Sequence, residues 1–65
     1  MPYVNVKVLE PLTDEQRADL VARTTDAIVQ ALERPAEYVY VVIDEISPER
    51  WGIGGELVSE RRKRR

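Results

Sequence analysis

The sequence predicts an α+β fold, with one β-α-β unit of two parallel strands and then a short hairpin arm. Three observations lead to this fold class. Residues 2–9 and 38–44 are rich in β-branched and aromatic side chains, which is typical of strands. A long stretch of helical periodicity separates them, and glycines cluster after the second run. A strand, a long helix and a parallel strand form a unit whose crossover is right-handed.

The first strand is expected over residues 2–9. Val4, Val6 and Val8 alternate with other side chains, the two-residue period of a strand. The segment Glu10-Pro11-Leu12 then interrupts the alternation. We therefore expect the strand to end near Leu9.

A helix is expected to start after Thr13 and to end at about Glu33 or Arg34. Thr13 can cap it, because Gln16 stands at the position that completes a capping box. Pro35 disfavours helical geometry at the residue before it and so ends the helix. One stripe of mostly apolar side chains recurs at helical spacing: Leu20, Val21, Thr24, Ala27, Ile28, Ala31 and Leu32.

The second strand is expected over residues 38–44, where the nearly continuous apolar character suits a strand covered on both faces. Residues 47–49 (Ser-Pro-Glu) are expected to turn the chain. Residues 51–58 contain three glycines and are expected to form the hairpin arm, with positive φ at its turn. One helix covers only one face of a two-stranded sheet, so the other face calls for a partner subunit.

Length and composition limit what this chain can be. A domain of 65 residues has a marginal core, and without Cys or His it has no disulfide and no Cys/His metal site to stabilise it. We expect no metal and no cofactor, and we expect oligomerisation to supply the missing stability. The absence of Cys fits a reducing cytoplasm. No signal peptide or membrane-spanning run is recognisable, so no membrane partner is expected.

The charge is divided unevenly along the chain. Residues 1–60 carry 5 Lys/Arg and 12 Asp/Glu, a balance of −7, whereas residues 61–65 are all basic and give +5. We divide the chain into a β-α-β domain (residues 1–60) and a basic C-terminal tail (residues 61–65). The acidic body would repel phosphates and no aromatic residues interleave the tail, so we expect no nucleic acid partner.

Pro2 is the candidate catalytic residue. Without His or Cys, no side chain has an ordinary pKa near neutrality. Removal of Met1 would give Pro2 a free secondary amine, and α-amines titrate at about 7.7–8.0. The alternative is structural, because proline is common at the start of a strand. While Met1 is attached, the Pro2 nitrogen is an amide and neither a base nor a nucleophile.

The ordered set of these features resembles the small subunits of the 4-oxalocrotonate tautomerase family. The resemblance rests on Pro2 after Met1, Leu9-Glu10 at the strand end, residues 13–16 (Thr-Asp-Glu-Gln), Pro35, and residues 51–57 (Trp-Gly-Ile-Gly-Gly-Glu-Leu). It covers nearly the whole chain. It implies a dimer-based hexamer, a trimer of dimers, in which each site is assembled from neighbouring subunits.

The resemblance also implies a chemistry and a set of site residues. An N-terminal proline acts as the general base that moves a proton in a keto–enol isomerisation. Pro2 matches this base, Trp51 matches an aromatic position of the arm, and Leu9 and Ile53 match apolar wall positions. The substrate is then a small enol or keto acid.

Two expected arginines are missing from this sequence. The family has arginines that bind the substrate's carboxylates and polarise its oxygen, and their positions hold Leu12 and Tyr40. Leu12 offers no donor, whereas Tyr40 keeps a phenolic one. Arg50, Arg61 or Arg62 could reach a site mouth in an oligomer, although a terminal arginine is ordinarily solvated. Asp44 and Glu45 should point to opposite faces of their strand and so do not form a water-activating pair.

Three hypotheses follow. The first is a keto–enol tautomerase that acts on a 2-hydroxy-dienoate or an aryl enolpyruvate type of substrate. Its pocket of Leu9, Leu12, Tyr40, Trp51 and Ile53 disfavours a dicarboxylate and prefers aromatic or monoacid enols such as phenylenolpyruvate. The second is a subunit of a hetero-oligomeric tautomerase whose partner chain supplies the arginines. The third is a non-catalytic or designed scaffold, which applies if Met1 is retained.

Overall fold

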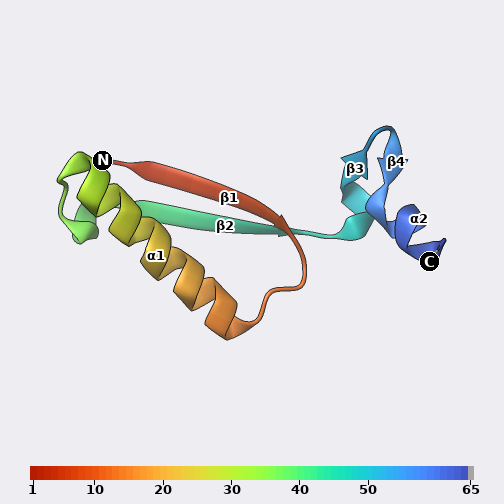
Figure 1. Cartoon of the computed structure of the whole chain (residues 1–65), viewed down its shortest axis with the longest axis horizontal. Coiled ribbons are helices and arrows are strands. Elements are labelled where there is room, and N and C mark those ends of the chain that lie inside the picture. Colours follow the sequence, from red (N-terminus) through yellow and green to blue (C-terminus); the bar gives the residue numbers. More distant parts are fainter. Residues whose placement is uncertain (65) are drawn as a thin grey trace.

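The computed structural model describes residues 1–64 and confirms the β-α-β unit (Figure 1). Strand β1 (Tyr3–Leu9) pairs in parallel with β2 (Tyr40–Ile46), in a register that places Tyr3 opposite Tyr40 and Leu9 opposite Ile46. Helix α1 (Asp14–Leu32) connects them and lies against one face of the sheet. Within residues 1–64, no helix is long and apolar enough to cross a membrane.

The capping box predicted for α1 is present. The Thr13 Oγ1 accepts the Gln16 backbone N–H at 3.0 Å, and the Gln16 Oε1 accepts the Thr13 N–H at 2.9 Å. The helix ends at Leu32, slightly earlier than expected, because Glu33 adopts the left-handed conformation (φ 54°, ψ 44°). Its N–H donates to the Val29 carbonyl at 2.9 Å and closes the last turn.

Strand β2 begins two residues later than the sequence predicted. Residues Ala36–Tyr38 form a short 3₁₀ helix (η1) instead, in which the Tyr38 N–H donates to the Pro35 carbonyl at 3.0 Å. The expected cover on both faces is also missing within this chain. Tyr40 is 53% exposed and Val42 is 42% exposed, because α1 covers the other face alone.

The arm follows a second 3₁₀ turn, η2 (Pro48–Arg50), at the turn predicted from Ser47-Pro48-Glu49. Strands β3 (Gly52–Ile53) and β4 (Glu56–Leu57) form an antiparallel hairpin. Gly54 and Gly55 connect them with φ of 60° and 87°, values that glycine adopts without strain. The hairpin predicted for residues 51–58 is therefore confirmed.

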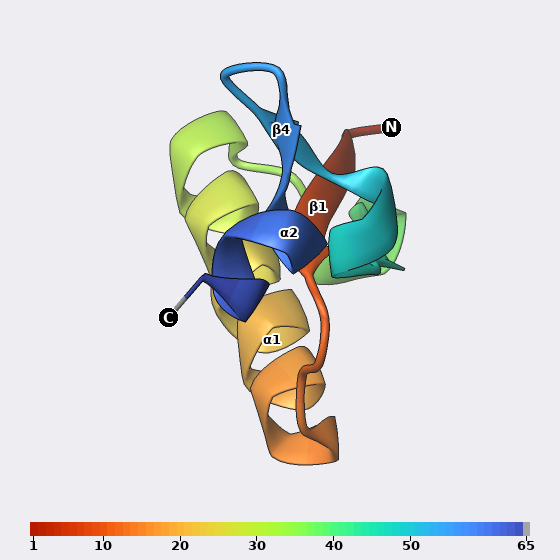
Figure 2. The same ribbon diagram turned by 90° about the vertical axis from the view of Figure 1, so that its right-hand side faces the viewer.

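A short helix, α2 (Val58–Lys63), follows the hairpin and was not predicted from the sequence. It crosses the division placed between residues 60 and 61, and Arg65 of the expected tail lies outside the described residues. Glu56 on β4 holds α2 in place through ion pairs with Arg61 (3.6 Å) and Arg64 (2.8 Å). Figure 2 looks at the chain from the side of the hairpin and shows α2 in front of the sheet.

The chain has almost no interior of its own. Among residues 1–64, only Val58 is buried, with 7% of its surface exposed. The radius of gyration is 15.2 Å, whereas a compact domain of this length has about 11 Å. The hairpin and α2 extend beyond the end of the sheet (Figure 1).

Candidate active site

Pro2 lies at the head of β1, in a shallow hollow of about 310 Å³ that also involves Met1, Arg34, Pro35 and Tyr38. Its carbonyl accepts the Tyr40 N–H at 2.9 Å, which fixes this end of β1 against β2. Met1 is 83% exposed, so its removal would disturb little packing. The loss of Met1 would remove one wall of this hollow and would free the Pro2 nitrogen, with Arg34, Pro35 and Tyr38 as the remaining walls.

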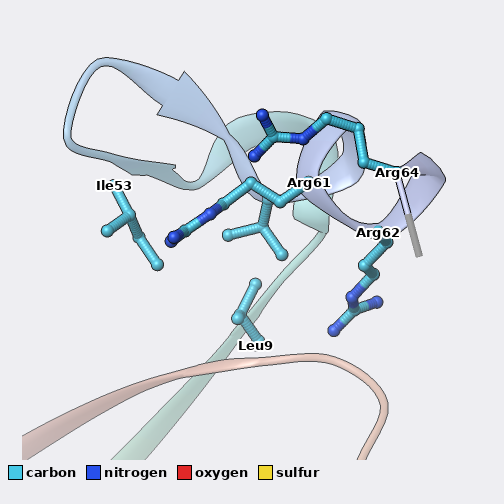
Figure 3. Close-up of a pocket in the computed structure, with 6 residues that line it drawn as sticks. Leu9, Ile53, Arg61, Arg62 and Arg64 are labelled. Atoms are coloured by element: carbon cyan, nitrogen blue, oxygen red, sulfur yellow. The ribbon is translucent and has the colours of Figure 1, made fainter.

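Leu9 and Ile53 lie together, but at the other end of the sheet. With Val58 and three arginines of the C-terminal segment (Arg61, Arg62 and Arg64), they line an open hollow of about 600 Å³ (Figure 3). Tyr3 and Leu9 stand at the two ends of β1, which are about 20 Å apart for a seven-residue strand. The predicted site residues thus fall into two groups that one chain does not bring together.

The remaining predicted residues lie between or beside these groups. Tyr40 stands next to the head of β1, on the sheet face that α1 leaves uncovered. In the described part of the chain, Trp51 is half-buried and lines neither hollow, and its carbonyl accepts the Val58 N–H at 2.8 Å. Among the candidate arginines, Arg61 and Arg62 line the Leu9 hollow and Arg50 does not.

The loop that carries Leu12 is held by Arg17 and Glu45. The Leu12 N–H donates to the Glu45 Oε1 at 3.3 Å, and the Arg17 Nη2 donates to the Leu12 carbonyl at 3.0 Å. Arg17 also contacts both oxygens of Glu45, through Nε to Oε2 and through Nη2 to Oε1 (3.1 Å). The hydrogen bond from Arg17 lowers the pKa of the Glu45 carboxyl below its ordinary value.

Asp44 and Glu45 point to opposite faces, as expected for neighbours in a strand. Asp44 accepts hydrogen bonds from Lys7 (2.9 Å) and Asn5 (3.0 Å), whereas Glu45 is bound to Arg17 of α1. The hydrogen bond from Lys7 lowers the pKa of the Asp44 carboxyl. Both acids serve in ion pairs, which gives no support to a water-activating pair.

The sequence analysis missed two residues at Pro2, namely Arg34 and Tyr38. The order of the predicted elements could have indicated their position. A parallel β-α-β crossover returns the chain to the edge at which the first strand starts, so the end of the helix must lie near the head of β1. The structure agrees, because Pro2 shares its hollow with Arg34 and Pro35, which follow α1 closely in the chain. Arg34 is the cation that this return places in the Pro2 hollow.

These features define a small β-α-β protein with a proline at the head of its first strand and a glycine-centred arm. A family model described as tautomerase enzyme matches residues 2–61. A probable tautomerase (K2) from Dickeya dadantii is 41% identical over 64 residues, which cover 97% of this chain and 96% of the relative.

Solved structures agree with this match. TomN, a 4-oxalocrotonate tautomerase homologue in the tomaymycin biosynthetic pathway, is 39% identical, with a TM-score of 0.92 over 95% of both chains. A heterohexamer 4-oxalocrotonate tautomerase from Chloroflexus aurantiacus is 30% identical, with a TM-score of 0.87 over 92% of this chain and 97% of that one. The chain belongs to the tautomerase family, among the 4-oxalocrotonate tautomerase homologues, and is an enzyme of the tautomerase class.

The Arg17–Glu45 pair makes a testable prediction for stability. Because the folded-state pKa of Glu45 is lowered, its stabilising contribution is present above about pH 4.3, the ordinary glutamate pKa, and is lost as pH falls through the folded value. Glu45→Gln should lower the urea midpoint at neutral pH and flatten its decline in acid.

Glu49→Gln is the matched control, because Glu49 is exposed and has no ion pair within residues 1–64. It should follow the wild-type curve of urea midpoint against pH. If Glu45→Gln followed that curve as well, the pair would contribute no pH-dependent stability.

Proposed function

We propose that this chain is a keto–enol tautomerase in which Pro2, freed of Met1, is the general base. The observation that carries the proposal is the position of Pro2, at the head of β1 and in a hollow that holds a cation and an aromatic side chain. No other group in the sequence ordinarily titrates near neutrality. The proline amine takes the proton of the enol hydroxyl and returns it to the neighbouring carbon, so no external reactant is needed.

We propose an aryl enolpyruvate as the substrate class, with recognition of a dicarboxylate weakened. Leu12 offers no side-chain donor at a position where the resemblance implies an arginine. Tyr40 can donate a hydrogen bond to the enolate oxygen from an uncharged phenol, without the ion pair and the paired N–H donors that an arginine would add. The apolar side chains of Leu9, Trp51 and Ile53 suit the aryl end of such a substrate.

We further propose that the complete site is formed between subunits of a homo-oligomer, a hexamer like that implied by the resemblance. Pro2 and Tyr40 lie at one end of the sheet, and Leu9 and Ile53 lie at the other. A neighbour that brings its Leu9 end to the Pro2 end of this chain would complete the pocket. A hetero-oligomer is the second candidate, because the Chloroflexus relative is a heterohexamer.

Pro2→Ala should lower kcat/KM on phenylenolpyruvate by about 10²–10⁴-fold, the usual contribution of a positioned acid–base group. Steady-state kinetics of the protein after Met1 removal, verified by intact mass, measures this effect. The same sequence with Met1 retained is the matched control and should be as inactive as the variant.

The same assay should show faster turnover of phenylenolpyruvate than of 2-hydroxymuconate. Faster turnover of the diacid would overturn the proposed substrate class. Full activity with Met1 attached would overturn the role of the Pro2 amine. If activity appeared only after a second, arginine-bearing chain was added, the hetero-oligomer would be favoured.

Tyr40→Phe should lower kcat by about tenfold or more, because oxyanion donors contribute up to about 10²–10³ in rate. Tyr3→Phe is the matched control, since Tyr3 pairs with Tyr40 across the sheet and is similarly exposed (63% against 53%). The comparison uses kcat on phenylenolpyruvate. Equal effects of the two variants would contradict a specific role for the Tyr40 hydroxyl.

Val42→Asp should shift the protein to smaller species in size-exclusion chromatography with light scattering. Val42 is 42% exposed on the uncovered sheet face, so its burial in an interface contributes about 1 kcal/mol for each copy, a fraction of the value for a fully exposed valine. Val42→Thr keeps the β-branched shape without a charge and should preserve the assembly. An unchanged size of Val42→Asp would show that this face is not an interface.

A further inference from the structure

The hollow at Pro2 contains a cation, Arg34, to which the proposed function gives no specific role. Met1, Pro2 and Pro35 carry no charged side chain, and Tyr38 carries a phenol, so Arg34 is the charged side chain among the described lining residues. Tyr38 is 51% exposed and presents its aromatic ring at the same hollow. An anionic group close to Pro2 would therefore find one arginine and one aromatic side chain.

The backbone holds Arg34 in this position. The left-handed Glu33 closes α1 on one side of it, and Pro35 follows with its φ fixed near −60°. The Tyr38 N–H donates to the Pro35 carbonyl at 3.0 Å, and the Tyr40 N–H then donates to the Pro2 carbonyl at 2.9 Å. The segment from α1 to β2 is thus connected to Pro2 by consecutive hydrogen bonds.

Within residues 1–64, no carboxylate forms a salt bridge with the guanidinium of Arg34. Within residues 1–64, most other cations form salt bridges with Asp or Glu: Lys7, Arg17, Arg23, Arg61, Lys63 and Arg64. Arg34 forms none in this part of the chain, although the body is acidic. Its donors are available to a ligand.

We propose that Arg34 binds the carboxylate of the substrate beside Pro2. The family resemblance implies carboxylate-binding arginines at residues 12 and 40, which are Leu and Tyr in this chain. This inference rests on the proposed role of Pro2. In a 2-hydroxy-2-enoic acid, the carboxylate is attached directly to the enol carbon. A carboxylate held on Arg34 by paired N–H···O bonds therefore places the reacting carbons next to the Pro2 nitrogen. The Tyr38 ring then forms one wall for the rest of the substrate.

The test compares Arg34→Gln with Arg23→Gln. Arg23 is 81% exposed on α1, and its Nε is 3.0 Å from Asp19, so the control removes the same charge away from Pro2. Arg34→Gln should raise KM for phenylenolpyruvate by about tenfold or more, with kcat changed much less, since charge-assisted hydrogen bonds are among the stronger polar contacts. Arg34→Lys keeps the charge and should recover part of the loss.

A second measurement needs no turnover. Titration calorimetry with 3-phenylpropanoate and with its neutral amide, 3-phenylpropanamide, should show that Arg34→Gln weakens binding of the acid by about tenfold and leaves the amide unchanged. A merely structural role of Arg34 would weaken the two ligands equally.

The outcomes separate this inference from the function on which it rests. If Pro2→Ala is inactive but Arg34→Gln matches Arg23→Gln in both KM and acid binding, the proposed carboxylate binding by Arg34 is overturned. The proposed role of Pro2 as the general base then stands. If Pro2→Ala keeps full activity, the proposed role of Pro2 as the general base is overturned. The calorimetric comparison of acid and amide then still decides whether Arg34 holds a carboxylate.

Discussion

The structure depends on one constraint, which is that a single helix covers a single face of a two-stranded parallel sheet. The face with Val4, Val6 and Val8 packs toward α1, whereas Tyr3, Tyr40 and Val42 remain largely exposed. Parallel sheets are ordinarily covered on both faces. A chain that buries only Val58 among its described residues has too little hydrophobic burial to be stable alone. The exposed face therefore favours cover by another subunit, and in the assembly proposed above that subunit would also bring opposite ends of two sheets together.

Local signals in the sequence predicted the fold well, and the exceptions have physical causes. The Thr13–Gln16 capping box and the glycine turn of the arm are encoded by side chains within a few residues of each other, and both are present. Strand β2 starts later than its apolar composition indicated, because the N–H groups of Tyr38 and Val39 close a 3₁₀ turn first. Helix α2 was missed because its contacts with Glu56 depend on the folded hairpin, which a run of basic residues does not reveal.

The candidate site was less predictable than the fold. Pro2 stands out in the sequence because of its chemistry. Leu9 and Ile53 lie together at the other end of the sheet, and their role as wall residues of the Pro2 site stays a prediction. Arg34 was missed because it lies 32 positions from Pro2 (34 − 2) and owes its place to the crossover alone. The family resemblance implies substrate-binding arginines at residues 12 and 40, whereas the structure places an arginine near Pro2 just after the end of α1.

With Arg34 as the proposed carboxylate site, the hollow at Pro2 would select its ligands by charge. Arg34 offers one guanidinium at the Pro2 hollow, while Leu12 and Tyr40 offer no cation. In the proposed assembly, a second carboxylate that lay against Leu9 and Ile53, away from the arginines of the same hollow, would remain an unpaired charge, and the desolvation of such a charge is costly. An aryl group in the same place gains from burial instead. On the proposals above, one arginine at the end of α1 would replace the arginines that the resemblance implies at residues 12 and 40, and would change the preferred substrate without a change in the proline chemistry. The fold would permit this replacement because the crossover brings the chain after α1 back to Pro2, the proposed base.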